Sequence, residues 1–244
     1  MIAAVACLLI TLACQDVERI AAPPRTMPTA HAVAGPPVVL AVTCTLLRNS
    51  NTISCAPATA RRGPGVSGTV HFEGRAYRSV SLAHLASRGL FYLPDYDLLS
   101  TAFSVRQQLE MLRAQFPGGN VVAAAARLGI EGRLDARPGA LSGGERRRAE
   151  LAAVLVRRPT CLLADEPFRG IAPKDAEDLT AVFSELARDG VAVVLTGHEV
   201  PTLLHVADHI SWCTSGTTYE LGPPAEARQH HAFQTEYLGP WAKS

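Results

Sequence analysis

The stretch Ser142-Gly143-Gly144-Glu145 combines residue types and a position that could do chemistry. Its glycines open into a helix-forming run that continues through Glu150 to Val156. The first N–H groups of a helix have no partner within it and lie at the positive end of the helix dipole. The stretch therefore predicts an anion-binding helix start suited to a phosphate group. The alternative is a flexible turn that binds nothing.

Two further polar sites each follow a short apolar run. Asp165 and Glu166 come after Thr160 to Ala164, and His198 comes shortly after Val191 to Leu195. Such runs suit buried parallel strands, and ligands of open α/β sheets gather at the carboxyl ends of strands. An isolated acidic pair is usually a solvated surface feature, and one histidine among eight is usually structural. Their positions behind predicted strands favour the functional interpretation.

In this order, the three sites resemble the signature motif, the Walker B motif with its catalytic glutamate, and the switch histidine of ATP-binding cassette (ABC) transport ATPases. The resemblance extends from about Ser67 to the C-terminus. Gly170 to Pro173 and Glu236 to Gly239 are similar to cassettes of the branched-chain amino-acid and lipopolysaccharide-export types. The resemblance implies an α/β, P-loop NTPase-like cassette with a parallel sheet core and a helical subdomain.

The resemblance implies ATP and Mg²⁺ as cofactors. It also implies a role for each of Asp165, Glu166 and His198. Asp165 would hold magnesium through water. Glu166 would polarise the attacking water, as phosphoryl transfer requires. His198 would contact the γ-phosphate and fix that water.

In this family, two cassettes close head to tail around ATP. Ser142, Gly143, Gly144 and Glu145 would then face nucleotide held by the second cassette. The resemblance thus implies two partners, a second cassette in a homodimer or heterodimer and a transmembrane permease.

Asp95 ends the predicted strand Gly89 to Leu93, where related cassettes carry Leu-Pro-Gln. In them, the glutamine reaches the magnesium and couples the site to the permease. An aspartate can still accept from a metal-bound water. It is, however, one methylene shorter and adds a charge, which distinguishes this chain from the family pattern.

A phosphate loop of the form GxxxxGKS/T is absent, and no lysine precedes Lys174. In intact P-loops, successive backbone N–H groups and the lysine hold the β and γ phosphates. The nearest glycines, Gly63, Gly65 and Gly68, enclose a proline that removes one N–H, so they predict a turn. The N-terminal part of the cassette is therefore incomplete. A natural fusion, a truncation and a misjoined sequence remain open explanations.

Composition favours a packed globular chain, with 48% hydrophobic and 18% charged residues. A net charge of +1 gives no bulk attraction to nucleic acid, so we expect no nucleic-acid partner. Residues 1–66 hold seven of the 17 prolines and four of the six cysteines, but only two acidic residues. We therefore predict a domain boundary between residues 66 and 67. Residues 1–66 would be a leader-like and linker segment unrelated to the cassette, and 67–244 a partial ABC ATPase domain.

Within the first segment, Ile2 to Ala13 is apolar, ends at Cys14 and resembles a bacterial lipoprotein leader. A chance apolar run is the alternative. Residues 38–47 could form one strand. Cys44 and Cys55 would pair in an oxidising compartment, or remain two unrelated thiols. An exported lipoprotein conflicts with an ATPase at the cytoplasmic face of the bacterial inner membrane, where ATP is available.

Helical spacing predicts two helices, one through Val105, Leu109 and Leu112 and one over Val121 to Leu128. We assign them to a helical subdomain over about residues 97–150. By resemblance this subdomain docks on the permease, although core-facing apolar stripes would have the same spacing.

The sequence thus predicts an ATP-binding and ATP-hydrolysing subunit of an ABC transporter. The main alternative is a non-catalytic or degenerate cassette that supplies only its signature motif to a partner ATPase. An exported binding lipoprotein is a more distant alternative.

Overall fold

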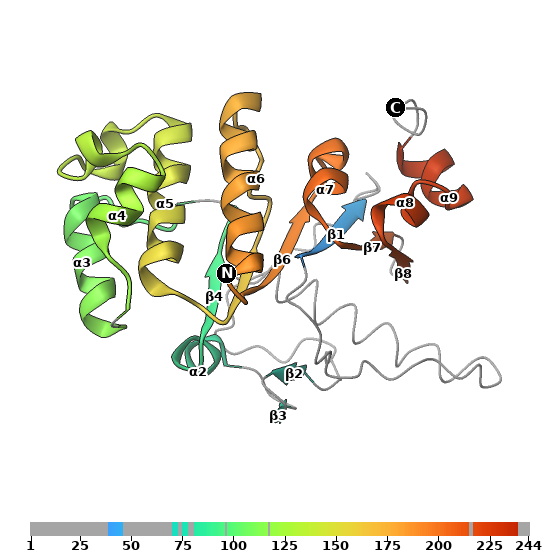
Figure 1. Ribbon diagram of the computed structural model, residues 1–244, viewed down its shortest axis with the longest axis horizontal. Helices are drawn as coiled ribbons and strands as arrows, with labels where there is room; N and C mark the ends of the chain where they lie inside the picture. Colours follow the sequence, from blue (N-terminus) through green and yellow to red (C-terminus); the bar gives the residue numbers. More distant parts are fainter. Residues whose placement is uncertain are drawn as a thin grey trace, which may run out of the picture.

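The computed structural model describes residues 39–45, 70–72, 75–77, 81–95, 97–116, 118–214 and 217–238. Its centre is a six-stranded sheet in the order β4-β5-β6-β1-β7-β8 (Figure 1). The first five strands in that order pair in parallel, and β8 is antiparallel to β7. The strands are β4 Leu90–Leu93, β5 Cys161–Ala164, β6 Ala192–Gly197, β1 Val39–Thr45, β7 His209–Thr214 and β8 Thr217–Gly222. The predicted α/β class with a parallel sheet core is confirmed.

Strand β1 lies between β6 and β7 and pairs with both. Val39 is in register with Val193, and Leu40 with His209. Residues 38–47 were predicted to hold a strand, but in a segment unrelated to the cassette. The pairing corrects that expectation for Val39–Thr45. The apolar character of this strand suits a central position in a parallel sheet.

Three helices gather at one end of the molecule (Figure 1). They are α3 Val105–Gln115, α4 Val121–Arg127 and α5 Gly143–Arg157, with short 3-10 turns η2 Glu131–Arg133 and η3 Pro138–Ala140 between α4 and α5. Val105 and Leu109 are buried, as are Val121 on α4 and Leu151 on α5. Both helices predicted in the helical subdomain are confirmed, and their apolar stripes face this shared core.

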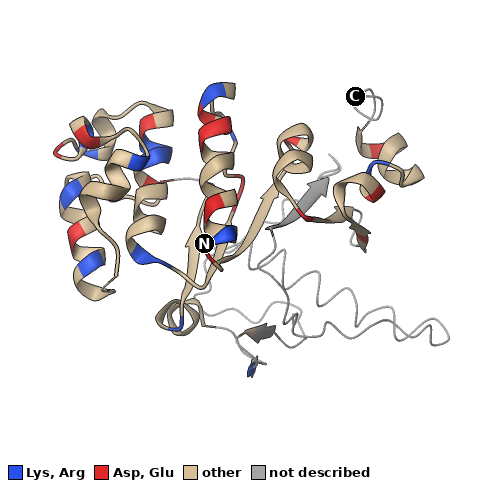
Figure 2. Cartoon of the chain, in the orientation of Figure 1, with Lys and Arg blue, Asp and Glu red and all other residues tan. Residues whose placement is uncertain are grey.

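Helices α6 Pro173–Arg188 and α7 Val200–Val206 pack against β6 and against each other. The apolar stripe on α6 is buried, including Phe183, whose ring meets the Phe168 ring edge to face with 5.7 Å between the ring centroids. Charged residues lie mainly on the helices and their connections, and β4, β5 and β6 carry none (Figure 2). This distribution is typical of strands covered on both faces.

The remaining described elements are short. A two-stranded antiparallel hairpin pairs β2 Val70–Phe72 with β3 Arg75–Tyr77. Helix α2 is Leu82–Ser87, and the C-terminal turns are α8 Pro224–Ala227, α9 His231–Phe233 and η4 Gln234–Leu238. The ring of the buried Trp212 anchors this end, 5.4 Å from Phe233 and 5.3 Å from Tyr219.

Several predictions for the first segment concern residues outside those described. They are the leader ending at Cys14, Cys55 as a partner of Cys44, and the glycines at 63, 65 and 68. None of the helices in the described ranges is both long enough and apolar enough to cross a bilayer.

Candidate functional site

The predicted helix start is present at Ser142, the N-cap of α5. The Ser142 hydroxyl accepts from the Glu145 amide at 3.2 Å, and the Glu145 carboxylate accepts from the Ser142 amide at 2.9 Å. This reciprocal capping box satisfies the N–H groups of Ser142 and Glu145. The Glu145 N–H lies in the first turn, whose N–H groups were expected to remain free for an anion. A Cβ on Gly144 would lie 2.5 Å from an Asp175 carboxylate oxygen, so a larger residue there would displace the Asp175 side chain.

Glu145 belongs to this cap and was predicted to contact nucleotide. Hydrogen bonds from Ser142 and from the Arg133 guanidinium lower its pKa from 4.5 to about 2. The Arg133 contact is 2.7 Å long. In the structure, Glu145 therefore stabilises the start of helix α5.

A pH-dependent stability follows from this cap. Because folding lowers the Glu145 pKa, its carboxylate stabilises the folded state above pH 4.5, and the contribution disappears as pH falls toward about 2. We expect the urea midpoint of unfolding to be higher for wild type than for Glu145→Gln near neutral pH. The difference between the two midpoints should shrink as the pH falls from 4.5 toward about 2. Glutamine preserves the capping box, so the comparison isolates the charge. A difference independent of pH would contradict the assignment.

Asp165 lies at the carboxyl end of β5 and is only 5% exposed. One carboxylate oxygen accepts from the Thr196 hydroxyl at 2.5 Å, and the other from the Tyr92 hydroxyl at 3.0 Å. The two hydroxyls come from the flanking strands β6 and β4 and orient the carboxylate. Each oxygen retains acceptor capacity for a metal-bound water, so the residue fits a magnesium site. Neither hydroxyl partner was predicted from the sequence.

Glu166 has a left-handed backbone, with φ of +46°, and its amide donates to the Thr196 carbonyl at 3.1 Å. Carboxylate oxygen Oε1 lies 2.9 Å from His198 Nδ1. Oxygen Oε2 is buried and has no hydrogen-bond partner among the described residues. Burial raises the pKa of Glu166, with further contributions from Glu199 and Asp165 opposed by His198. A raised pKa brings a carboxylate closer to the range in which it works as a general base.

His198 directly follows β6, and its side chain is 58% exposed. It therefore reaches Glu166 from the adjacent strand end while remaining open to solvent. Glu199, which the sequence analysis missed, joins the pair. Ligand atoms of Glu166, His198 and Glu199 lie within 4.8 Å of one another. Two carboxylates and an imidazole can bind a divalent cation.

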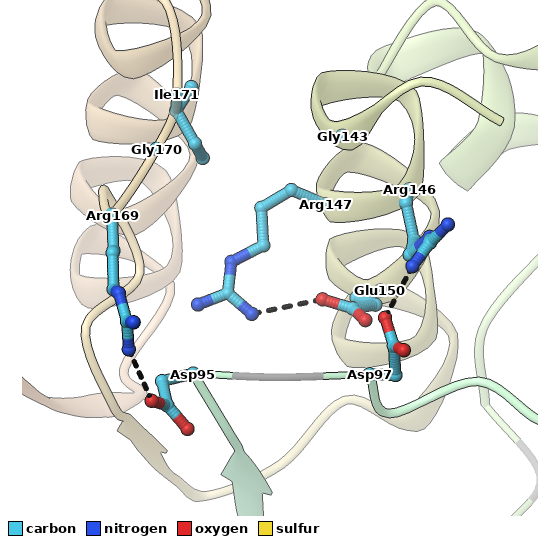
Figure 3. A pocket seen from close by; sticks show the side chains of 9 residues that line it. All are labelled: Asp95, Asp97, Gly143, Arg146, Arg147, Glu150, Arg169, Gly170 and Ile171. Atoms are coloured by element: carbon cyan, nitrogen blue, oxygen red, sulfur yellow. Dashed lines mark hydrogen bonds and ion pairs between the residues drawn. The ribbon is translucent and has the colours of Figure 1, made fainter.

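Asp95 forms an ion pair of its own. Its carboxylate accepts from the Arg169 guanidinium at 2.9 Å, in the loop that follows Glu166 (Figure 3). Nearby, Asp97 accepts from Arg146 on α5 at 2.6 Å. The proposed contact of Asp95 with a metal-bound water remains a prediction, and its observed partner is an arginine.

A pocket of about 160 Å³ lies between these ion pairs (Figure 3). The end of β4, helix α5 and the loop after β5 all contribute to its wall. The lining residues are Asp95, Asp97, Gly143, Arg146, Arg147, Glu150, Arg169, Gly170 and Ile171. No sequence pattern marks Arg147 as buried, because a run of arginines on a helix is ordinarily a solvated face.

The site residues form two groups. Asp165, Glu166 and His198 converge at the carboxyl ends of β5 and β6. Within the described residues, Ser142 forms no hydrogen bond or ion pair with Glu166 or His198. The first group can orient a water and a metal ion, whereas the helix start needs a ligand presented from elsewhere. Residues 46–69, which follow β1, are outside the described ranges, so the missing phosphate loop is a finding of sequence alone.

A family model described as ABC transporter matches residues 56–169, beginning inside the segment that the predicted boundary sets apart. The chain is 35% identical over 177 residues to the hemin import ATP-binding protein HmuV of Streptomyces coelicolor, covering 69% of this chain and 63% of HmuV. It is 30% identical over 164 residues to the lipopolysaccharide export system ATP-binding protein LptB of Escherichia coli K12, covering 63% and 67%. The chain thus spans about two thirds of these relatives.

A solved ATP-binding cassette of an ABC transporter, in its ADP conformation, superposes with a TM-score of 0.60. The match covers 73% of this chain and 78% of that chain, at 20% sequence identity. At that identity the likeness establishes the fold, and the predicted cassette architecture is confirmed.

Proposed function

Because this chain belongs to the ABC transporter family of ATP-binding proteins, we propose that it is an ATP-binding and ATP-hydrolysing subunit that energises a membrane permease. The observation that carries the proposal is the 2.9 Å contact between Glu166 and His198 beside the oriented carboxylate of Asp165. Phosphoryl transfer to water needs a positioned water, a metal site and stabilisation of phosphate charge. These three side chains offer the first two.

Each residue has a defined task in this proposal. Asp165 holds Mg²⁺ through water, and the ion neutralises phosphate charge when bound. Glu166 accepts a hydrogen bond from the attacking water through the carboxylate oxygen that has no protein partner in the described residues. His198 donates to the γ-phosphate and keeps the Glu166 carboxylate in place.

We further propose two protein partners. A second cassette, identical or different, brings its ATP to Ser142, Gly143 and Gly144. A permease docks on the helical subdomain, where Phe103, Met111 and Val122 are exposed apolar side chains. The chain would then work at the cytoplasmic face of the inner membrane. HmuV and LptB are named for different cargoes, hemin and lipopolysaccharide, so cargo choice would belong to the permease.

A second candidate function follows from the sequence itself. No GxxxxGKS/T occurs in the chain, and its first lysine is Lys174. A cassette without this loop cannot grip the β and γ phosphates at its own Asp165 and Glu166. It could still complete an intact partner's site through Ser142, as a non-catalytic subunit.

The test is an ATPase assay on the purified chain, alone and mixed with a cassette that has an intact phosphate loop. Hydrolysis by the chain alone supports the first function. Stimulation of the partner's rate by this chain, without hydrolysis by the chain alone, supports the second. If the chain neither hydrolyses ATP nor stimulates the partner, both functions are refuted.

A further inference from the structure

Arg147, in the second turn of α5, is only 7% exposed although it carries a full positive charge. Its guanidinium has five N–H groups, and all five are used. Nη1 donates to the Pro94 carbonyl at 2.7 Å and to Glu150 at 2.9 Å. Nε donates to the Pro167 carbonyl at 3.2 Å, and Nη2 to the carbonyls of Asp165 and Glu166, each at 3.2 Å.

Glu150, one turn further along α5, completes a neutral buried pair. It is 3% exposed. Its Oε2 accepts from Arg147, and its Oε1 accepts from the Leu98 amide at 3.0 Å. A buried ion pair is tolerated when its remaining hydrogen-bonding capacity is satisfied, which is the case here. The pair therefore joins α5 to the segments on both sides of Asp95.

Three consecutive carbonyls bound by Arg147 belong to Asp165, Glu166 and Pro167. The middle residue has the left-handed φ of +46°, a conformation that costs free energy for a non-glycine residue. Such a residue persists only where its surroundings hold it. Arg147 supplies that restraint together with the Thr196 carbonyl, which accepts from the Glu166 amide.

We infer that Arg147 is a positioning residue for Glu166. It sets the backbone from which the Glu166 carboxylate reaches toward His198, and it links that backbone to the signature helix and to the end of β4. This inference rests on the proposed function for its catalytic consequence, because Glu166 is the residue assigned to the attacking water. Arg147 itself touches no reacting atom.

The first test is hydrogen–deuterium exchange on the full chain without nucleotide, comparing wild type with Arg147→Lys. A lysine ammonium keeps the charge but cannot reach carbonyls in three directions, because it lacks the planar fork. The amides of Asp165 and Glu166 donate to the Leu93 and Thr196 carbonyls. We expect their exchange to quicken by about tenfold or more, with β7 amides unchanged.

Two controls separate positioning from general destabilisation. Arg127→Lys alters an exposed bidentate pair with Glu185 and should leave the Asp165 and Glu166 amides at wild-type rates. Leu151→Ala makes a cavity in the same helix and should quicken exchange across the cassette. If Arg147→Lys leaves the two amides at the wild-type rate, or behaves like Leu151→Ala, the inference is overturned.

If Arg147→Lys does not fold, the double variant Arg147→Met with Glu150→Leu decides, because it leaves no unpaired buried charge. It should show the same local increase, and wild-type exchange would overturn the inference. In an assembly whose ATP hydrolysis depends on Glu166 of this chain, Arg147→Lys should lower kcat at least about tenfold with KM unchanged. An unchanged kcat would also overturn it. If wild type hydrolyses nothing in any assembly, the proposed function fails, and the exchange result still decides the role of Arg147.

Discussion

Replacing Glu166 by Gln is expected to lower kcat for ATP hydrolysis by about 10²- to 10⁴-fold, the range typical of a general base. Glutamine keeps the size of the side chain but cannot take a proton from water. The raised pKa of Glu166, caused first by burial, makes the carboxylate a better base than one in solvent. Steady-state kinetics of phosphate release would measure the loss, and KM for ATP should change little.

Glu177→Gln is the matched control for this variant, because Glu177 is an exposed glutamate on α6. Its rate should equal that of wild type. If hydrolysis by this chain's own site survives Glu166→Gln, the residue has no role in the mechanism, and the contact with His198 serves structure alone.

Ser142→Arg is expected to abolish the stimulation that this chain gives to an intact partner cassette. A long cationic side chain would occupy the space that the partner's γ-phosphate must enter at the start of α5. It would also remove the N-cap, which costs about 0.5–2 kcal/mol of helix stability. The readout is the partner's ATPase rate at increasing concentrations of this chain, with wild type raising the rate and the variant leaving it at the basal value.

Ser104→Arg supplies a control with the same chemistry in another helix. Ser104 caps α3 through a capping box with Gln107, as Ser142 caps α5 with Glu145. Both variants lose a cap, but only Ser142→Arg should lose stimulation. Equal behaviour of the two variants would show that cap loss, rather than the blocked phosphate site, is responsible.

The two variants together distinguish the two candidate functions. If hydrolysis depends on Glu166 of this chain, its own site is active despite the missing phosphate loop. If hydrolysis depends on Ser142 but is indifferent to Glu166, the chain serves only the partner's site. The Glu166–His198 pair would then remain assembled but idle.

Local patterns were enough to predict most of the elements and the main site residues. Ser142 and the glycines after it indicated a helix start because capping and helix propensity act within one turn. The apolar runs before Asp165 and His198 predicted strands because buried parallel strands are continuously apolar. In the structure, Glu166 and His198 meet at the carboxyl ends of these strands, with 2.9 Å between a Glu166 carboxylate oxygen and His198 Nδ1.

Only the tertiary structure decided which distant groups meet. The strand Val39–Thr45 was assigned to a separate segment because residues 1–66 differ in composition from the rest of the chain, yet its backbone pairs with β6 and β7. Asp95 turned out to face Arg169, a partner far along the chain. Arg147 is the clearest case, since four of its five bonds go to main-chain carbonyls. Every residue carries such a carbonyl, so no pattern of side chains marks these acceptors, and only folding brings them within reach of one guanidinium.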